Sequence, residues 1–148
     1  MRQNASSGLT KTRTTRIAVD VGIIVANMDR ALAFYRDLLR LTVVAELTTS
    51  LIGKGRMVQL RHGESLIKLV ELEESPVHHI PTGLSSSLGY RYVTLLVTDI
   101  DTMMTRLAQA NVVITVPVTQ LGNGANIAMV ADPDGNIIEF VQENASKT

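Results

Sequence analysis

The chain has 148 residues, of which 45% are hydrophobic, and its 14 basic residues balance its 14 acidic residues. This size suits one compact domain or two small packed halves, and the zero net charge favours neither nucleic acid nor an anionic membrane. The absence of cysteine excludes disulfides, thiolate metal sites and cysteine nucleophiles.

The N-terminal segment 1–16 contains basic residues with Ser, Thr and Asn, and it has no acid and no apolar core. It therefore lacks the hydrophobic stretch of a secretory signal, and nowhere is the chain apolar for long enough to cross a bilayer. We predict a cytoplasmic protein that binds neither nucleic acid nor membrane, with a disordered tail at 1–16 and a second tail at 143–148.

A repeat organises the rest of the chain, because the pattern of residues 20–29 returns 72 positions later at 92–101. Each copy has a short apolar run typical of a strand, then Asn27 or Asp99, then apolar residues at helical spacing. Asn and Asp are favoured N-cap residues, so we expect the helices to begin directly after them.

Three strand-like segments follow each predicted helix, after a first strand that we place at 17–25 in the first copy. The later segments are 41–48, 56–61 and 65–72 in the first copy, and 112–118, 126–131 and 136–142 in the second. The sequence therefore predicts an α+β fold of two tandem βαβββ modules, at 17–72 and 91–142, with a linker at 73–90.

Two motifs in this frame match a known family. One is Val21-Gly22-Ile23-Ile24-Val25 leading into Phe34-Tyr35, and the other is Asp132-Pro133-Asp134-Gly135-Asn136 leading into Glu139-Phe140. Over residues 17–142 the chain resembles the vicinal oxygen chelate superfamily, which includes glyoxalase I, extradiol dioxygenases and bleomycin resistance proteins. The resemblance implies a curved mixed sheet that forms a cup. It also implies glycine after the first helix, where this chain has Arg40.

Metal enzymes of that superfamily hold the ion with four residues, one from the first and one from the last strand of each module. The matching positions here are Asp20, Lys68, Tyr92 and Glu139. A protonated Lys has no acceptor atom and repels a divalent cation, and a neutral phenol is a poor ligand. We therefore expect no metal and no other cofactor; if a metal does bind, the ligands are Asp20 and Glu139.

Strand alternation separates these polar positions from the apolar ones. It predicts that the helix-facing side is filled by Val21, Ile23, Val25, Val93, Leu95 and Val97. Lys68, Thr94 and Glu139 then lie on the opposite, concave face. Gln59 stands where epimerases of the superfamily have a glutamate base, and an amide cannot take a proton.

Three functions stay open, all with a small-molecule ligand. The first is a metal-independent isomerase or lyase acting on an acidic or carbonyl-bearing molecule, in which Lys68 stabilises an anionic oxygen and Glu139 or Asp20 moves a proton. Tyr92, Gln59 and Thr94 would then contact the ligand.

The second is a non-catalytic protein that binds a drug-like or cationic ligand, and the third is a metal-dependent lyase or dioxygenase. The charged residues could also form an ion-pair network without a ligand. We expect a homodimer, since small proteins of this resemblance usually pair.

Overall fold

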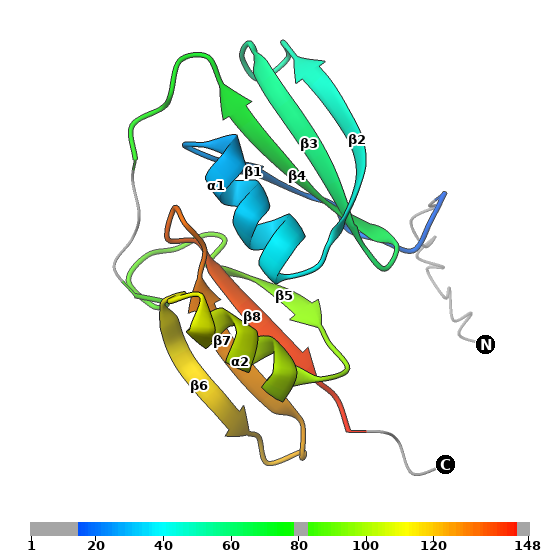
Figure 1. Cartoon of the computed structure of the whole chain (residues 1–148), viewed down its shortest axis with the longest axis vertical. Coiled ribbons are helices and arrows are strands. Elements are labelled where there is room, and N and C mark those ends of the chain that lie inside the picture. The colour runs from blue at the N-terminus through cyan, green and yellow to red at the C-terminus, as the bar shows by residue number, and fades with distance from the viewer. Residues whose placement is uncertain (1–14, 79–82, 145–148) are drawn as a thin grey trace, which may run out of the picture.

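The computed structural model describes residues 15–78 and 83–144, so parts of the predicted tails and linker lie outside the described residues. The chain forms two modules of the same topology, each a four-stranded mixed sheet with a helix on one face (Figure 1). The strand orders are β1-β4-β3-β2 and β5-β8-β7-β6, and in each sheet the first strand runs parallel to the last. The predicted α+β class and the duplicated βαβββ unit are confirmed.

The first module contains β1 (Val21–Ile24), α1 (Met28–Leu32), the π-helix η1 (Ala33–Leu38), β2 (Thr42–Thr49), β3 (Gly55–His62) and β4 (Ser65–Leu72). The second contains β5 (Tyr92–Leu96), α2 (Ile100–Gln109), β6 (Ile114–Gln120), β7 (Asn126–Ala131) and β8 (Ile137–Gln142). The strand predicted at 17–25 is shorter than expected, because its ladder with β4 begins only where Val21 pairs with Ile67.

Both helices begin at the predicted residues and are capped in the same way. The Asn27 side chain accepts a 2.9 Å hydrogen bond from an amide of the first turn, and Glu71, from β4, accepts one of 2.9 Å from the amide of Met28. In α2 the same two roles fall to Asp99 and to Gln142 from β8. The last strand of each module thus satisfies an amide that the helix leaves without a partner.

The first helix widens into a π-helix after α1. The amide of Leu39 bonds to the carbonyl of Phe34 at 2.9 Å, which is an i to i+5 contact. Consecutive aromatic side chains, Phe34 and Tyr35, are therefore both buried, with their rings edge to face at 4.9 Å.

Each helix is followed by one residue with left-handed backbone. Arg40 has a φ of 64° and Asn111 a φ of 56°. This is the region that glycine adopts most easily, and asparagine tolerates it better than arginine does. Arg40 therefore keeps the turn for which the resemblance implies glycine, at a cost in backbone strain.

The core lies between the sheets and the helices and is continuous across both modules. The predicted alternation is confirmed, since Val21 and Ile23 of β1 and Val93 and Leu95 of β5 pack on the helix side. The buried cluster joins residues of both helices to both sheets, among them Met28, Leu32, Leu69, Leu107, Ile138 and Phe140.

A buried hydrogen bond links the two modules and joins the two family motifs. Tyr35 is completely buried, and its hydroxyl donates to Oδ2 of Asp132 at 2.6 Å. The Asp132 carboxylate also accepts from the amides of Asp134 at 2.9 Å and Asn136 at 2.8 Å, which fixes the turn before β8. Burial, together with the negative charge of Asp132, raises the pKa of Tyr35 well above its ordinary value, so the phenol remains a donor.

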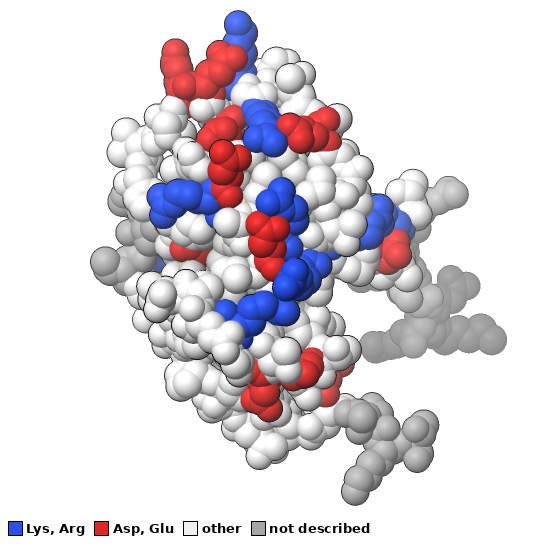
Figure 2. Space-filling model, in the orientation of Figure 1, with Lys and Arg blue, Asp and Glu red and all other residues white. Residues whose placement is uncertain are grey.

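The helix-bearing face carries its charges unevenly. Basic side chains lie near the boundary between the two modules, acidic ones lie toward the far end of the lower module, and the upper module mixes both signs (Figure 2). No helix in residues 15–78 and 83–144 combines the length and the apolarity needed to span a bilayer.

Candidate functional site

The predicted site residues lie on the face of the two sheets that the helices leave open. In the first sheet, the register places Lys68 between Gly22 on β1 and Gln59 on β3. In the second sheet, Glu139 is paired with Thr94 of β5. Residues paired directly across a ladder project from the same face, so Lys68 and Glu139 occupy equivalent places in the two modules.

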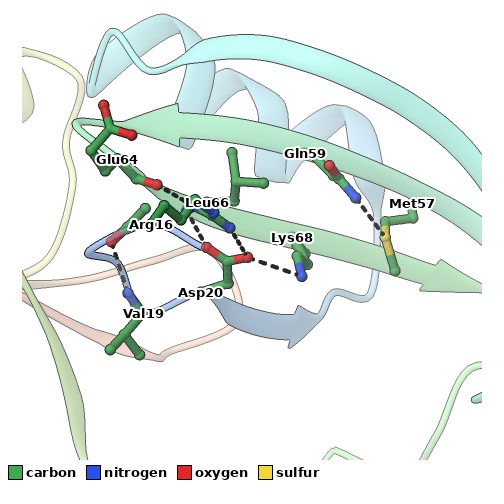
Figure 3. A network of polar contacts seen from close by, with 9 residues as sticks. Arg16, Val19, Asp20, Met57, Gln59, Glu64, Leu66 and Lys68 are labelled. Atoms are coloured by element: carbon green, nitrogen blue, oxygen red, sulfur yellow. Dashed lines mark hydrogen bonds and ion pairs between the residues drawn. The ribbon is translucent and has the colours of Figure 1, made fainter. Parts of the chain in front are cut away.

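Asp20 is the centre of a polar cluster just before β1 (Figure 3). Its Oδ1 accepts a 3.0 Å hydrogen bond from the amide of Leu66, and its Oδ2 lies 3.2 Å from Nζ of Lys68. The guanidinium of Arg16 contacts the same Oδ2 and also donates to the carbonyl of Glu64. The Asp20 side chain therefore continues the β1–β4 ladder one step before the strand begins.

Sequence analysis placed Arg16 in the tail and missed this contact. The available signal was the cation four residues before Asp20, but in a segment with no predicted structure that spacing says nothing about proximity. The remainder of the predicted N-terminal tail, residues 1–14, lies outside the described residues.

The pKa of Asp20 lies below its ordinary value. Partial burial alone would raise this pKa, but the hydrogen bonds from Leu66, Arg16 and Lys68 together outweigh it. A carboxylate that is held ionised by several donors is a poor general base at neutral pH. The geometry thus favours Asp20 as an anchor for Lys68 over Asp20 as a proton carrier.

Glu139 has a different environment. Its Oε2 accepts a 2.6 Å hydrogen bond from the hydroxyl of Thr94, and its other ladder neighbour is Met129 of β7. Within the described part of the chain Glu139 makes no ion pair. Tyr92, two pairs away from Thr94 on the β5–β8 ladder, is 51% exposed. Of the four positions, Asp20 and Lys68 therefore form one pair, whereas Glu139 is bonded to Thr94 and not to Tyr92.

A cavity of about 780 Å³ lies between the edge strands β1 and β5, and both modules contribute to its walls. Its size is within the range of roughly 300–1,000 Å³ that is usual for small-molecule sites. Three of the six predicted residues line it: Asp20, Tyr92 and Thr94. Lys68 and Glu139 are not among the lining residues, but each is bonded to one of them. Gln59 is not part of the wall, and its Nε2 lies 3.7 Å from the sulfur of Met57.

Sequence analysis did not assign to the site five further polar residues that line this cavity: His62, Ser65, Tyr90, Arg91 and Asn136. Two of them carry basic side chains, His62 at the end of β3 and Arg91 just before β5. The Arg91 guanidinium donates to the backbone carbonyls of Leu84, at 3.1 Å, and Gly83, at 2.7 Å. No motif marks Arg91, since its position depends on the path of the linker.

These residues do not fit a divalent metal. Nowhere in residues 15–78 and 83–144 do three His, Cys, Asp or Glu side chains gather in a way that could hold one. Asp20 already contacts two cationic groups, the side chains of Arg16 and Lys68, and both would repel a metal. The donor set thus differs from the four-ligand cup that the resemblance implied.

Comparison with known families assigns the chain. The model of the glyoxalase/bleomycin resistance protein/dioxygenase superfamily matches residues 17–140. The chain belongs to this superfamily. The resemblance found in the sequence is thereby confirmed, while a search of curated proteins gave no match.

Solved structures of the superfamily share the fold. A glyoxalase family protein from Bacillus cereus has a TM-score of 0.76 and 22% identity, with 93% of this chain and 99% of that chain covered. The trypanothione-dependent glyoxalase I of Leishmania major has a TM-score of 0.67 and 22% identity, with 87% and 88% covered. A lactoylglutathione lyase from Agrobacterium tumefaciens has a TM-score of 0.62 and 20% identity, with 93% and 100% covered. At these identities the likeness establishes the fold.

Proposed function

We propose that this superfamily member binds a small acidic or carbonyl-bearing molecule in the cavity between β1 and β5, without a metal, and acts on it as an isomerase or lyase. The observation that carries the proposal is that two residues lining this cavity, one from each module, hold an ammonium and a carboxylate. Nζ of Lys68 lies 3.2 Å from Oδ2 of Asp20, and the hydroxyl of Thr94 donates to Oε2 of Glu139.

The two groups suit different parts of one reaction. The Lys68 side chain is 33% exposed and has three N–H donors, so it can bind a ligand oxygen while it remains beside Asp20. An ammonium at that place stabilises the negative charge that develops when a carbonyl compound loses an α-proton. Glu139, which makes no ion pair in the described residues, is the candidate that accepts and returns the proton.

Proton exchange tests this function without knowledge of the natural substrate. 2-Oxobutyrate is a suitable probe, since deuterium from D₂O enters its C3 position whenever it enolises, and NMR follows both exchange and binding. We expect the wild-type protein to bind the probe and to accelerate exchange. Glu139→Gln should retain binding and lose exchange, and Lys68→Met should weaken both.

Binding without any accelerated exchange would argue against the enzyme. Unchanged binding in Lys68→Met would exclude Lys68 from the site. Stoichiometric divalent metal retained by protein prepared without chelator would contradict the metal-independent mechanism.

Non-catalytic binding is the second candidate, and the engaged state of Asp20 favours it. Two cationic side chains and a backbone amide occupy its carboxylate, which leaves Glu139 as the acidic group for a cationic or drug-like ligand. The exchange experiment separates the two candidates. A non-catalytic binding protein should not accelerate proton exchange, and it should bind a cationic ligand tightly, with Glu139→Gln abolishing that binding.

We also propose that two copies pair in a cytoplasmic homodimer. The support is apolar surface on the open faces of the sheets, where Ile24 is 45% exposed, Leu47 47% and Leu96 56%. Surface of this kind on both modules suits the self-complementary contact of a two-fold dimer. Sedimentation equilibrium should give a dimer for wild type and for the control Leu88→Glu, and a monomer for Leu47→Glu; a wild-type monomer would refute the pairing.

A further inference from the structure

A second cavity, of about 330 Å³, lies between the end of the first helix and α2. Its apolar wall comes from both modules and includes Leu39, Leu41, Val97 and Phe140. Its polar members are His62, Thr98, Asp99, Thr102 and Arg106. It borders the cavity described above through His62 and Leu95, which line both.

Arg106, in the last turn of α2, is the unusual member of this wall. Its Nε is the one buried side-chain nitrogen or oxygen in the described part of the chain that has no hydrogen-bond partner. Its Nη2 reaches only a weak acceptor, the sulfur of Met103, at 3.3 Å. None of the ion pairs among residues 15–78 and 83–144 includes Arg106.

An arginine in this state has unused binding capacity. The guanidinium is always charged and carries five N–H donors in a planar fork that matches carboxylate and phosphate groups. A buried donor without an acceptor is unfavourable, and a ligand that supplies the acceptor removes the cost. The surroundings of Arg106 therefore fit a bound oxyanion.

Asp99 is the acidic group in the same wall, and its carboxylate is directed elsewhere. It accepts hydrogen bonds from the amide of Thr102 at 2.9 Å and from its hydroxyl at 2.7 Å. Seven residues of α-helix separate Asp99 from Arg106, which corresponds to about 10 Å along the axis. Basic side chains gather on this face at the boundary between the modules, which favours an anion there (Figure 2).

We propose that this second cavity is a ligand site in its own right, and that it takes a small molecule whose carboxylate or phosphate group binds Arg106. The apolar wall, with Leu39 and Phe140, accommodates the carbon skeleton of the ligand. The site does not depend on the function proposed for the first cavity, because its anchor, Arg106, lies on α2 and lines only the second cavity.

NMR titration tests the site with two defined probes, inorganic phosphate and succinate, each added at constant ionic strength. The side-chain Nε–Hε signal of Arg106 reports binding directly. We expect a saturable shift of this signal with at least one probe in the wild-type protein. A response to phosphate alone identifies a phosphate site, and a response to succinate alone identifies a carboxylate site.

Two variants and a control complete the test. Arg106→Met should weaken binding by about tenfold or more, measured from the backbone signals of Thr98 and Thr102, which line only this cavity. Arg106→Lys keeps the charge and loses the fork, so it should also weaken binding, which secures the test if the Met variant folds poorly. The control is Arg36→Met, which removes an exposed ion pair outside both cavities and should bind as wild type does.

Two results would overturn the proposal. One is the absence of a saturable Arg106 shift with either probe in the wild-type protein. The other is unchanged affinity in Arg106→Met and Arg106→Lys.

Discussion

Tyr35→Phe tests the buried link between the two modules. The substitution keeps the ring and removes only the hydroxyl that donates to Asp132 at 2.6 Å. A buried hydrogen bond to a charged group contributes roughly 1.5–3 kcal/mol, and Asp132 retains its bonds from Asp134 and Asn136. We therefore expect the free energy of unfolding to fall by about 2 kcal/mol and Tm to fall by roughly 6 °C.

Urea unfolding followed by far-UV circular dichroism measures this loss, and Tyr92→Phe is the matched control. Tyr92 is half exposed, so its variant should stay within about 0.5 kcal/mol of wild type. An unchanged denaturant slope would show that the folded and unfolded states keep their compactness. Equal stabilities for the two variants would refute the structural importance of the link.

The pH dependence gives an independent check of the same bond. Since the folded pKa of Tyr35 is raised, its contribution is fully present below the ordinary tyrosine pKa of 10.0 and is lost as pH rises above it. Wild type should thus lose stability from about pH 10 upward, because the unfolded phenol ionises there. Tyr35→Phe has no phenol to ionise at this position, so the difference in free energy of unfolding between wild type and this variant should narrow above pH 10. A constant difference up to pH 11 would contradict the reasoning.

Three further variants test other features. Arg40→Gly removes the strain of a left-handed residue and should raise the free energy of unfolding by about 1 kcal/mol in urea. Asn111→Gly should change it by only about 0.3 kcal/mol. An equal gain at both sites would refute the strain argument. Gly55→Ala should destabilise by about 3 kcal/mol, because the new Cβ would lie 2.2 Å from a backbone oxygen, whereas Gly22→Ala meets nothing within 4 Å and should be neutral in the same assay. Because the folded pKa of Asp20 is lowered, its ion pairs stabilise the fold above the ordinary pKa of 3.8, and this stability is lost as pH falls below that value. Asp20→Asn should therefore lose less stability than wild type in thermal scans at decreasing pH. An equal fall of Tm with pH in both proteins would count against the ion pairs.

The fold could be predicted from the sequence because its signals are local. Asn27 and Asp99 mark helix starts by residue type alone, and alternation along β1 and β5 separates the core face from the open face within a few residues. Such signals do not depend on how the modules are placed. The repeat then supplies the same information a second time.

The site could be predicted only in part, because it depends on contacts between distant residues. Lys68 and Glu139 were correctly placed on equivalent strands, but their separation into two pairs follows from the relative position of the modules. That position is fixed by contacts such as Tyr35 with Asp132, which are 97 residues apart. The second cavity depends on the same placement, so nothing in the local pattern around Arg106 announces it.

The π-helix η1 explains how two halves of unequal length stay in register. From Asn27 to Arg40 the chain advances thirteen positions, but from Asp99 to Asn111, the corresponding residues, it advances twelve. One added residue in a regular α-helix would rotate every later side chain by about 100°. The wider turn at η1 absorbs that residue locally, so the last strand of each module stands at the same distance in sequence from the end of its helix. The one-residue difference between the two helical segments is thus confined to one turn of helix, and that turn is also the one that buries Phe34 beside Tyr35.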